Sequence, residues 1–192
     1  SNPIGLINED FLTNNQHPYA QSKLKAEELI KKNFKNSGTK FLILRLSNVI
    51  ASPLFKETNC WELVAQNICK QIFEKKYIAL RSNPGTLRDF IGINVLNKFL
   101  EYYFANLSFI NSDTYNFASG KSITILELAN KIKNKYLKLF NDKIEIKYEE
   151  FDVYNFKKEE FCFSIKKIES LGYKIENELN NEIKQLLKFS KL

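Results

Sequence analysis

The chain has few of the residues on which metal and disulfide chemistry depend. Its 192 residues include one histidine, His17, and three cysteines with no close Cys-x-x-Cys pair. An odd number of separated cysteines argues against a disulfide framework and against a zinc site. A single histidine leaves a Ser-His-Asp triad or a multi-histidine metal site almost without the residues it needs. We therefore expect no bound metal, and we interpret the three thiols as structural.

The sequence also lacks a long apolar run. Its longest, Phe41 to Leu46, is far too short to cross a bilayer, and the polar N-terminus shows no signal-peptide pattern. Hydrophobic residues make up 44% of the chain, which is typical of a globular protein. A length of 192 residues suffices for one ordinary domain with a core. We therefore expect a soluble, cytoplasmic protein with no membrane partner.

Arginine is scarce, although the net charge is +7. Only Arg45, Arg81 and Arg88 are present, whereas the lysines are spread along amphipathic segments rather than gathered in one block. Arginine is the better residue for reading base edges, so the charge does not predict a nucleic-acid partner. Methionine is absent altogether, position 1 included, and the chain opens in what reads as a loop. We therefore expect a portion of a longer protein.

Helix and strand signals alternate along the chain, which predicts an α/β fold. The run Phe41–Leu46 is apolar almost throughout, as expected of a strand covered on both faces of a parallel sheet. Thr124 and Glu127 form a capping box that opens a helix with four inward residues, namely Ile125, Leu128, Ile132 and Tyr136. Helices are expected over about 19–34, 59–73, 95–102, 124–136, 165–171 and 179–189, and strands over 41–46, 77–80, 88–91, 114–118 and 143–148.

The strongest chemical signal is the pair Tyr19 and Lys23. Residues four apart on a helix share a face, with Cβ atoms about 5–6 Å apart. An ammonium beside a phenol favours the phenolate, which can exchange a proton with a sugar hydroxyl near neutral pH. The spacing alone is weak, because nine tyrosines and many lysines produce such pairs by chance. Tyr154 and Lys158 form a second pair, which we interpret as accidental, and spacing alone leaves Tyr19 open as an ordinary residue of an amphipathic helix.

Five segments carry patterns that become specific when they are taken together in chain order. The first is PYAQSKLKAEELI, from Pro18 to Ile30, and the second is LRLSNVIASP, from Leu44 to Pro53. The others are GTLRDFI, YNFASGKSITILELA and IKKIESLGY, at residues 85–91, 115–129 and 165–173. They resemble P-Y-x-x-S-K-x-x-x-E, L-R-x-x-N-V-x-G-P, G-x-x-x-R-D-[FY]-I, Y-N-[VL]-G-x-G and S-K-x-x-x-L-G-[WY]. These are motifs of the extended short-chain dehydrogenases/reductases that modify nucleotide sugars, the NAD-dependent epimerase/dehydratase family.

The resemblance implies roles for four residues. Tyr19 matches the catalytic acid/base of the family, and Lys23 matches the lysine that binds the nicotinamide ribose and tunes that tyrosine, so both also contact NAD or NADP. Asn48 and Arg88 match residues that bind the substrate nucleotide and its diphosphate, a task suited to the fork of a guanidinium. From the residues alone, Asn48 could instead be a turn residue after a strand, and Arg88 could form a surface ion pair with a neighbour such as Asp89.

The fold implied by the resemblance is a partial Rossmann-type parallel sheet. Residues 1–55 would form the C-terminal part of the Rossmann core with the Tyr–Lys helix, and residues 56–192 a mixed substrate-binding region with the last core elements. The six glycines nowhere form G-x-x-G-x-x-G, and the strand that carries the catalytic Ser or Thr of the family is absent. We therefore expect the isolated chain to bind NAD poorly and to be inactive. Four residues depart from the motifs, namely Ala51, Ala118, Val95 and Ser164. The identity of the sugar stays open because Ala51 and Ala118 replace glycines near the expected ligand edge.

The activity implied by the resemblance is the modification of a nucleoside-diphosphate sugar, as in polysaccharide biosynthesis. Hydride passes from the sugar to NAD, Tyr19 takes the hydroxyl proton, and a keto sugar forms. We favour 4-epimerisation, and a sugar-nucleotide 4,6-dehydratase, a keto-sugar reductase and a non-catalytic nucleotide-binding relative remain alternatives. The family also implies a homodimer built around the Tyr–Lys helix. The choice between NAD and NADP stays open, because the residue that selects between them lies upstream.

Overall fold

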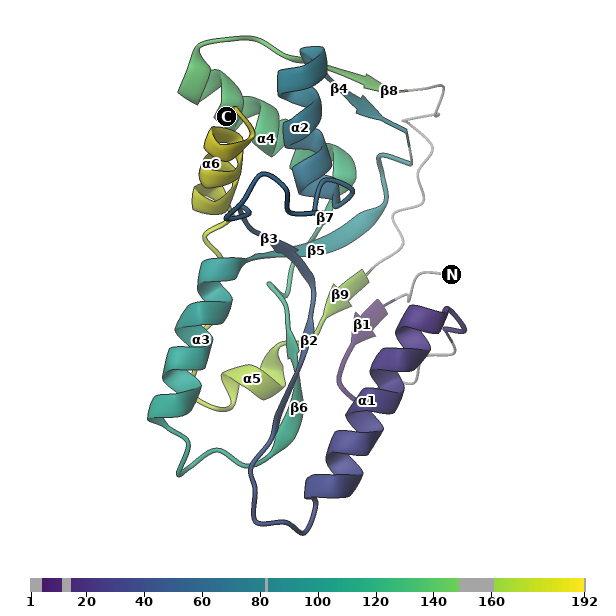
Figure 1. Cartoon of the computed structure of the whole chain (residues 1–192), viewed down its shortest axis with the longest axis vertical. Coiled ribbons are helices and arrows are strands. Elements are labelled where there is room, and N and C mark those ends of the chain that lie inside the picture. The colour runs from purple at the N-terminus through teal and green to yellow at the C-terminus, as the bar shows by residue number, and fades with distance from the viewer. Residues whose placement is uncertain (1–4, 12–14, 82, 149–160, 192) are drawn as a thin grey trace.

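In the computed structural model the chain is described over residues 5–11, 15–81, 83–148 and 161–191. Helices and strands alternate along it (Figure 1). The helices are α1 (Pro18–Phe34), α2 (Val64–Lys75), α3 (Ile93–Ala105), α4 (Ile125–Phe140), α5 (Lys166–Glu169) and α6 (Leu179–Ser190). The strands are β1 (Gly5–Ile7), β2 (Leu42–Leu46), β3 (Asn48–Ile50), β4 (Tyr77–Leu80), β5 (Leu87–Gly92), β6 (Asp113–Phe117), β7 (Ser122–Thr124), β8 (Glu145–Tyr148) and β9 (Phe161–Phe163).

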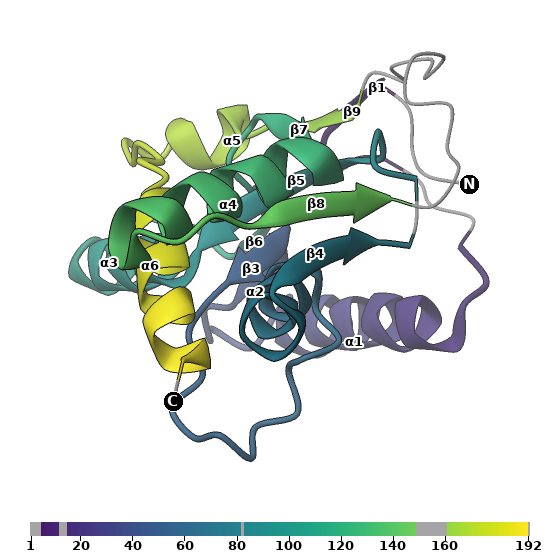
Figure 2. The same ribbon diagram turned by 90° about the horizontal axis from the view of Figure 1, so that it is seen from above.

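Most strand pairs are parallel. Strand β2 pairs with β6, β3 with β5, β4 with β8 and β1 with β9, whereas β7 joins β5 in antiparallel orientation. Figure 2 shows β4 and β8 side by side in the view from above. Parallel neighbours need crossover connections, which helices supply here. The predicted α/β fold class is confirmed.

Two buried clusters hold these elements together. One lies among α2, α4, α6 and β4, and the other lies between α3, α5 and β6. Strand β5 contributes to both, with Phe90 in the first cluster and Ile91 in the second. Consecutive strand residues point to opposite faces of the strand, so β5 is packed from both sides. The strand that carries Arg88 is thereby one of the most firmly held elements of the fold.

Helix α4 begins where the capping box predicts. The Thr124 side-chain oxygen accepts the Glu127 N–H at 3.0 Å, and the Glu127 carboxylate accepts the Thr124 N–H at 2.6 Å. The four predicted inward residues are all buried: Ile125, Leu128, Ile132 and Tyr136. Here the helical period of the sequence and the local capping signal agree, and both predictions are confirmed.

The predicted start of α2 is wrong. The sequence places it near Asn59, whereas the helix begins at Val64. The preceding residues form turns, in which the Leu63 N–H donates to the Cys60 carbonyl at 3.1 Å. Trp61, in this segment, stacks on Phe189 of α6 with ring centroids 6.2 Å apart.

The prediction that Phe41–Leu46 is a parallel strand covered on both faces is confirmed in part. Strand β2 pairs in parallel with β6, Ile43 is buried, and Leu42 and Leu44, on the opposite face, pack against the second cluster, whereas Leu46 is exposed. The short strands β1, β3, β7 and β9 were not expected from the sequence, because three residues are too few to show a period. The proposed division of the chain at residue 55 remains a prediction.

The described residues contain no helix with the length and apolar character needed to cross a membrane. Cys60, Cys69 and Cys162 are all free thiols. Cys69 has no exposed surface, and its burial raises the pKa of its thiol. This is the environment expected of a structural cysteine rather than of a reactive one.

A buried carboxylate connects α6 to the start of α3. The Glu182 side chain is almost fully buried, and its Oε1 accepts the Asn94 N–H at 3.2 Å in the first turn of α3. Gly92 makes this approach possible, because a Cβ at that position would lie 2.7 Å from the Glu182 Cγ. Burial raises the pKa of Glu182 above the ordinary value of 4.5.

The raised pKa of Glu182 predicts a pH dependence of stability. The native state holds this proton more tightly than the unfolded chain, so the contribution to the free energy of unfolding is present at low pH. It is lost as the pH rises from about 4.5 through the raised pKa. Glu182→Gln, which keeps an acceptor oxygen for Asn94, should remove this loss. Urea unfolding at several pH values between 4 and 8 should give a flatter profile for the variant, and parallel profiles would contradict the prediction.

Candidate functional site

Tyr19 and Lys23 lie on the same side of α1, as their spacing predicts. The Lys23 Nζ stands 5.3 Å from the centroid of the Tyr19 ring. Tyr19 is 67% exposed, so its hydroxyl is not enclosed in an apolar core. The ammonium stands over the ring in a cation–π contact, which keeps the two side chains together at the surface of the helix. The arrangement is compatible with a proton-transferring tyrosine that is open to a bound molecule.

The local sequence explains why α1 begins where it does. Pro18 occupies the first helical position, where its missing N–H costs nothing, and His17 is the N-cap. The His17 Nδ1 accepts the Tyr19 N–H at 3.3 Å, so the one histidine of the chain serves the helix rather than a catalytic triad. Tyr19 is thereby held in the first turn of α1, near its exposed end.

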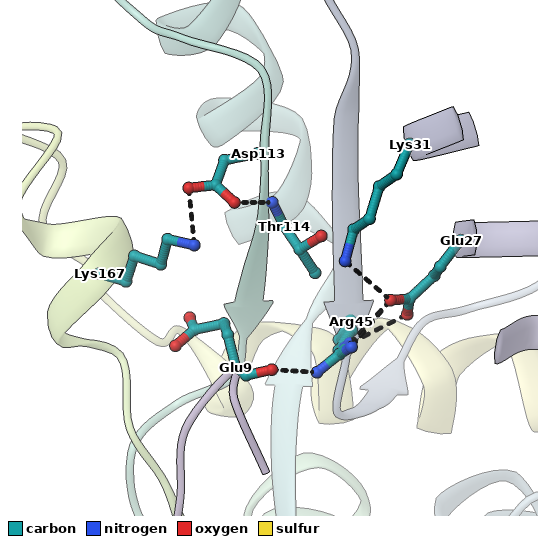
Figure 3. Close-up of polar contacts among 7 residues, drawn as sticks. All are labelled: Glu9, Glu27, Lys31, Arg45, Asp113, Thr114 and Lys167. Carbon is teal, nitrogen blue, oxygen red and sulfur yellow. Dashed lines mark hydrogen bonds and ion pairs between the residues drawn. The ribbon is translucent and has the colours of Figure 1, made fainter. Parts of the chain in front are cut away.

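Helix α1 is attached to the sheet by an ion pair (Figure 3). Arg45, in β2, donates from Nε and Nη2 to the Glu27 carboxylate at 2.9 and 2.8 Å, and from Nη1 to the Glu9 carbonyl at 2.7 Å. The Glu9 carboxylate in turn accepts the Asn116 N–H of β6 at 2.8 Å. One arginine therefore connects α1, β2 and the segment that follows β1.

Asn48 and Arg88 lie on two adjacent strands. Asn48 opens β3 directly after β2, and β3 pairs with β5, which contains Arg88. The Asn48 Nδ2 donates to the Asp89 carbonyl at 2.8 Å, which holds its amide beside the residue that follows Arg88. The structure thus brings together the two residues predicted to bind substrate. Their roles remain predictions.

The alternative in which Arg88 pairs with Asp89 is contradicted. The Arg88 Nη1 donates to the Leu87 carbonyl at 2.9 Å, whereas the Asp89 side chain is fully buried. The Asp89 carboxylate accepts the N–H and hydroxyl of Ser119 at 2.8 and 2.9 Å and the Lys121 N–H at 3.2 Å. These bonds fix β5 against the turn between β6 and β7, and they leave Arg88 outside this network.

The Tyr–Lys pair and Asn48 lie toward the same end of the β2–β6 pair. Helix α1 runs alongside β2 in the opposite direction, so its first turn lies level with the carboxyl end of that strand (Figure 1). Asn48 follows that end directly. In open α/β sheets, ligands bind at the carboxyl ends of parallel strands. Tyr19, Lys23 and Asn48 therefore lie toward the end of the sheet at which ligands bind in this class of fold, and Arg88 lies on β5, which pairs with the strand of Asn48.

A hollow of about 430 Å³ lies between α2 and β4. Its lining includes Asn67, Gln71, Leu80, Arg81 and Ile125. The volume falls in the range of small-molecule sites. Ile125 follows Thr124, which pairs with the residue before Arg88, so one wall of the hollow adjoins the strand that carries the candidate guanidinium.

Over the described ranges of the chain, no three or more His, Cys, Asp or Glu side chains gather in a way that could hold a metal ion. The second Tyr–Lys pair, Tyr154 and Lys158, lies outside the described residues. Among the departures from the family motifs, Ala118 is fully buried, and the Ala51 carbonyl accepts a hydrogen bond from Gln66.

Comparison with known proteins supports the Rossmann-type α/β fold that the sequence predicts. An NAD-binding family described as "Male sterility protein" matches residues 6–99. A protein of Methanocaldococcus jannaschii named "Putative UDP-glucose 4-epimerase" is 29% identical over 187 residues, which cover 96% of this chain and 57% of that protein. Nearly the whole length of this chain is thus similar in sequence to part of a protein that is named as an epimerase.

Solved structures share the fold at lower identity. UDP-glucuronic acid 4-epimerase from Bacillus cereus, in complex with NAD, superposes with a TM-score of 0.76 at 19% identity, covering 99% of this chain and 55% of that one. RMD from Pseudomonas aeruginosa, in complex with NADPH, gives 0.74 at 21% identity, covering 96% and 60%. The chain therefore spans a little over half the length of each relative.

These matches and the parallel strand pairs define a Rossmann-type α/β protein. The family model covers residues 6–99, and the similarity to the protein of Methanocaldococcus jannaschii runs along nearly the whole chain, so both comparisons agree with the resemblance to the extended short-chain dehydrogenases/reductases. The predicted fold class is confirmed.

Sequence reasoning missed the residues that hold the candidate groups in place. Glu27, Arg45 and Asp89 were present in the motifs as the E of the Tyr–Lys helix, the R of L-R-x-x-N-V and the D of R-D-F-I. The motifs by themselves indicate no partner for Glu27 or Arg45, and they suggest Arg88 rather than Ser119 as a partner for Asp89. A charged residue at an otherwise apolar strand position, such as Arg45 in FLILRL, is a signal for a partner, because an unpaired charge there would be costly.

Proposed function

We propose that this chain contributes the Tyr–Lys helix and the nucleotide-binding strands to an NAD-dependent enzyme that modifies a nucleoside-diphosphate sugar. The observation that carries the proposal is the Tyr19–Lys23 pair, with its ammonium 5.3 Å from the ring of an exposed tyrosine, level with the carboxyl end of β2. The archaeal relative supports the substrate class by its name, a UDP-glucose 4-epimerase.

Tyr19 is the proposed acid/base. Its phenolate takes the proton from a sugar hydroxyl while the carbon that bears this hydroxyl is oxidised, and it returns the proton when the keto sugar is reduced. NAD, when bound, supplies the hydride acceptor and donor for this carbon. Lys23 stabilises the phenolate and holds the ribose of the nicotinamide. An exposed ammonium beside an exposed phenol fits a cofactor ribose, which offers hydroxyl groups to both side chains.

Asn48 and Arg88 are the proposed substrate-binding residues. The guanidinium of Arg88 suits the diphosphate, since its fork binds phosphate oxygens in pairs. The amide of Asn48 is held by the Asp89 carbonyl and presents its remaining polar atoms near the end of β2. The hollow between α2 and β4 has the size for the nucleoside end of the substrate, and it adjoins the strand of Arg88.

Epimerisation at C4 is the proposed reaction. It needs one acid/base and one hydride carrier, together with a keto sugar that can present either face to the returning hydride. We further propose that the complete protein is a cytoplasmic homodimer. The 192-residue chain alone is expected to be inactive, because it contains no G-x-x-G-x-x-G loop for the cofactor phosphates.

The test is a turnover assay with a panel of UDP-, GDP-, CDP- and dTDP-sugars. The complete protein and the 192-residue chain are each incubated with NAD, and products are identified by NMR and mass spectrometry. We expect a 4-epimer of unchanged mass from the complete protein and no product from the chain alone. A product lighter by one water would indicate a dehydratase, and net consumption of NADPH a reductase. No turnover with any sugar would refute the proposed function, and turnover by the chain alone would refute its expected inactivity.

A further inference from the structure

Helix α1 is held to the rest of the protein by few contacts. None of its 17 residues is buried. Its face toward the sheet consists of half-buried side chains, namely Ala20, Gln21, Leu24, Glu27 and Ile30. Burial of apolar area is the usual force that fixes a helix, and here it is small. Polar contacts must therefore contribute an unusual share of the force that sets the position of this helix.

The contact with the best geometry is the Arg45–Glu27 pair. Arg45 Nε lies 2.9 and 3.2 Å from the two Glu27 carboxylate oxygens, and Nη2 lies 2.8 Å from Oε2. The Glu27 side chain is 16% exposed and the Arg45 side chain 29%. A two-point, largely buried pair fixes orientation as well as distance, unlike a surface ion pair. The third nitrogen of the Arg45 guanidinium, Nη1, donates to the Glu9 carbonyl, so the arginine side chain is itself fixed in position.

The Arg45–Glu27 pair is connected to both parts of the candidate site, the Tyr–Lys pair and Asn48, by short stretches of regular backbone. Glu27 is four residues after Lys23 on α1, which is about 6 Å along a helix axis. Arg45 is three residues before Asn48, which is about 10 Å along extended chain. Both stretches are regular backbone apart from the single residue between β2 and β3. A shift of Glu27 relative to Arg45 would therefore move Tyr19 and Lys23 relative to Asn48 by a similar amount.

We propose that Arg45 and Glu27 are positioning residues, which set the height and rotation of the Tyr19–Lys23 pair against the carboxyl end of β2. The inference rests on the proposed function, since it assigns these two residues to the same site. Their effect on rate follows from geometry, because a misplacement of about 1 Å in a reacting group can cost about 10²-fold. Neither residue needs to touch the substrate.

The first test measures α1 in the 192-residue chain and needs no activity. Amide hydrogen exchange is followed by mass spectrometry in the wild type, in Arg45→Met and in Glu27→Gln. We expect exchange across residues 20–34 to be at least tenfold faster in both variants, with α4 unchanged. The matched control is Lys98→Met, which removes the Lys98–Glu178 pair between α3 and the N-cap of α6 and should leave α1 unchanged. Unchanged protection of α1 in Arg45→Met and Glu27→Gln would overturn the proposal.

The second test uses the complete protein with its nucleotide sugar and NAD. Arg45→Lys keeps the charge and the fold while losing the two-point contact, and we expect its kcat to fall about tenfold with a KM within threefold of wild type. The charge exchange Arg45→Glu with Glu27→Arg should recover part of the kcat lost by either single change. If Arg45 and Glu27 had a merely structural role, their variants would have a lower Tm and an unaltered kcat per folded molecule, and that result would overturn the proposal.

Tyr19→Phe separates the positioning role from the proposed function. If Tyr19→Phe is inactive while Arg45→Lys has the wild-type kcat, only the positioning role fails. If Tyr19→Phe is fully active, the proposed function fails.

Discussion

Replacing Tyr19 with Phe in the complete protein should lower kcat by about 10²- to 10⁴-fold, which is the range expected for the loss of a general acid/base. The substitution removes one oxygen and keeps the ring over which the Lys23 ammonium stands at 5.3 Å. Because the ring is 67% exposed and packs in no core, the fold should be unaffected. The KM for the nucleotide sugar should change little, since the hydroxyl acts on the reacting carbon. Steady-state kinetics at saturating NAD measures both constants.

A matched control exists in the same chain. Tyr77, at the start of β4, also carries a lysine ammonium over its ring, with the Lys147 Nζ 4.4 Å from the centroid. Tyr77→Phe makes the same chemical change beneath a lysine ammonium but away from α1, and its kcat should be within twofold of wild type. If Tyr19→Phe and Tyr77→Phe behave alike, the Tyr–Lys pair is an ordinary helix contact. A protein that binds nucleotide without catalysing a reaction would then be the better interpretation.

Much of the fold could be predicted from the sequence because its signals are local. The capping box at Thr124 and the inward stripe of α4 depend on residues three or four positions apart, and both are confirmed. The strand at Tyr77–Leu80 and the turn at Asn83–Gly85 are likewise confirmed, the turn by the bond from the Gly85 N–H to the Asn83 side chain. In each case the residues that specify the element lie within it.

The parts that could not be predicted depend on residues far apart in the chain. Arg45 meets Glu27 across 18 positions, and the Glu9 carboxylate meets the Asn116 N–H across 107. How completely the two faces of β2 are covered depends on the elements, distant in the chain, that pack on them, and an apolar run cannot specify these by itself. The candidate side chains could be named from motifs. The bonds that hold them could be found only in three dimensions.

The largest loss of stability is expected from Asp89→Ala. The wild-type carboxylate is fully buried and accepts the N–H and the hydroxyl of Ser119 and the N–H of Lys121. Alanine would remove the acceptor of the Ser119 N–H, whereas the Lys121 N–H keeps the Ser119 Oγ as an acceptor at 3.2 Å. The loss of these hydrogen bonds to a fully buried carboxylate should lower the free energy of unfolding by about 1–3 kcal/mol. Chemical denaturation with urea measures this difference.

Two further variants show whether the buried hydrogen bonds are responsible. Asp89→Asn keeps one acceptor oxygen but places an amide NH₂ against the same donors, so its loss should lie between those of the wild type and Asp89→Ala. Glu74→Ala removes an exposed carboxylate, paired with Lys70 at 3.8 Å on α2, and should cost less than about 0.5 kcal/mol. If Asp89→Ala lost no more than Glu74→Ala, the turn between β6 and β7 would have to satisfy its own N–H groups.

Asp89 also connects stability with the candidate site. Its carboxylate ties β5 to the turn between β6 and β7, and its carbonyl holds the Asn48 amide at 2.8 Å. If this turn opens in Asp89→Ala, β5 loses the restraint that fixes both Asn48 and Arg88. The affinity of the folded variant for nucleoside diphosphate should then fall together with its stability. A variant that is less stable but binds the nucleotide as tightly as the wild type would show that β3 and the core contacts of Phe90 and Ile91 suffice to hold the strand.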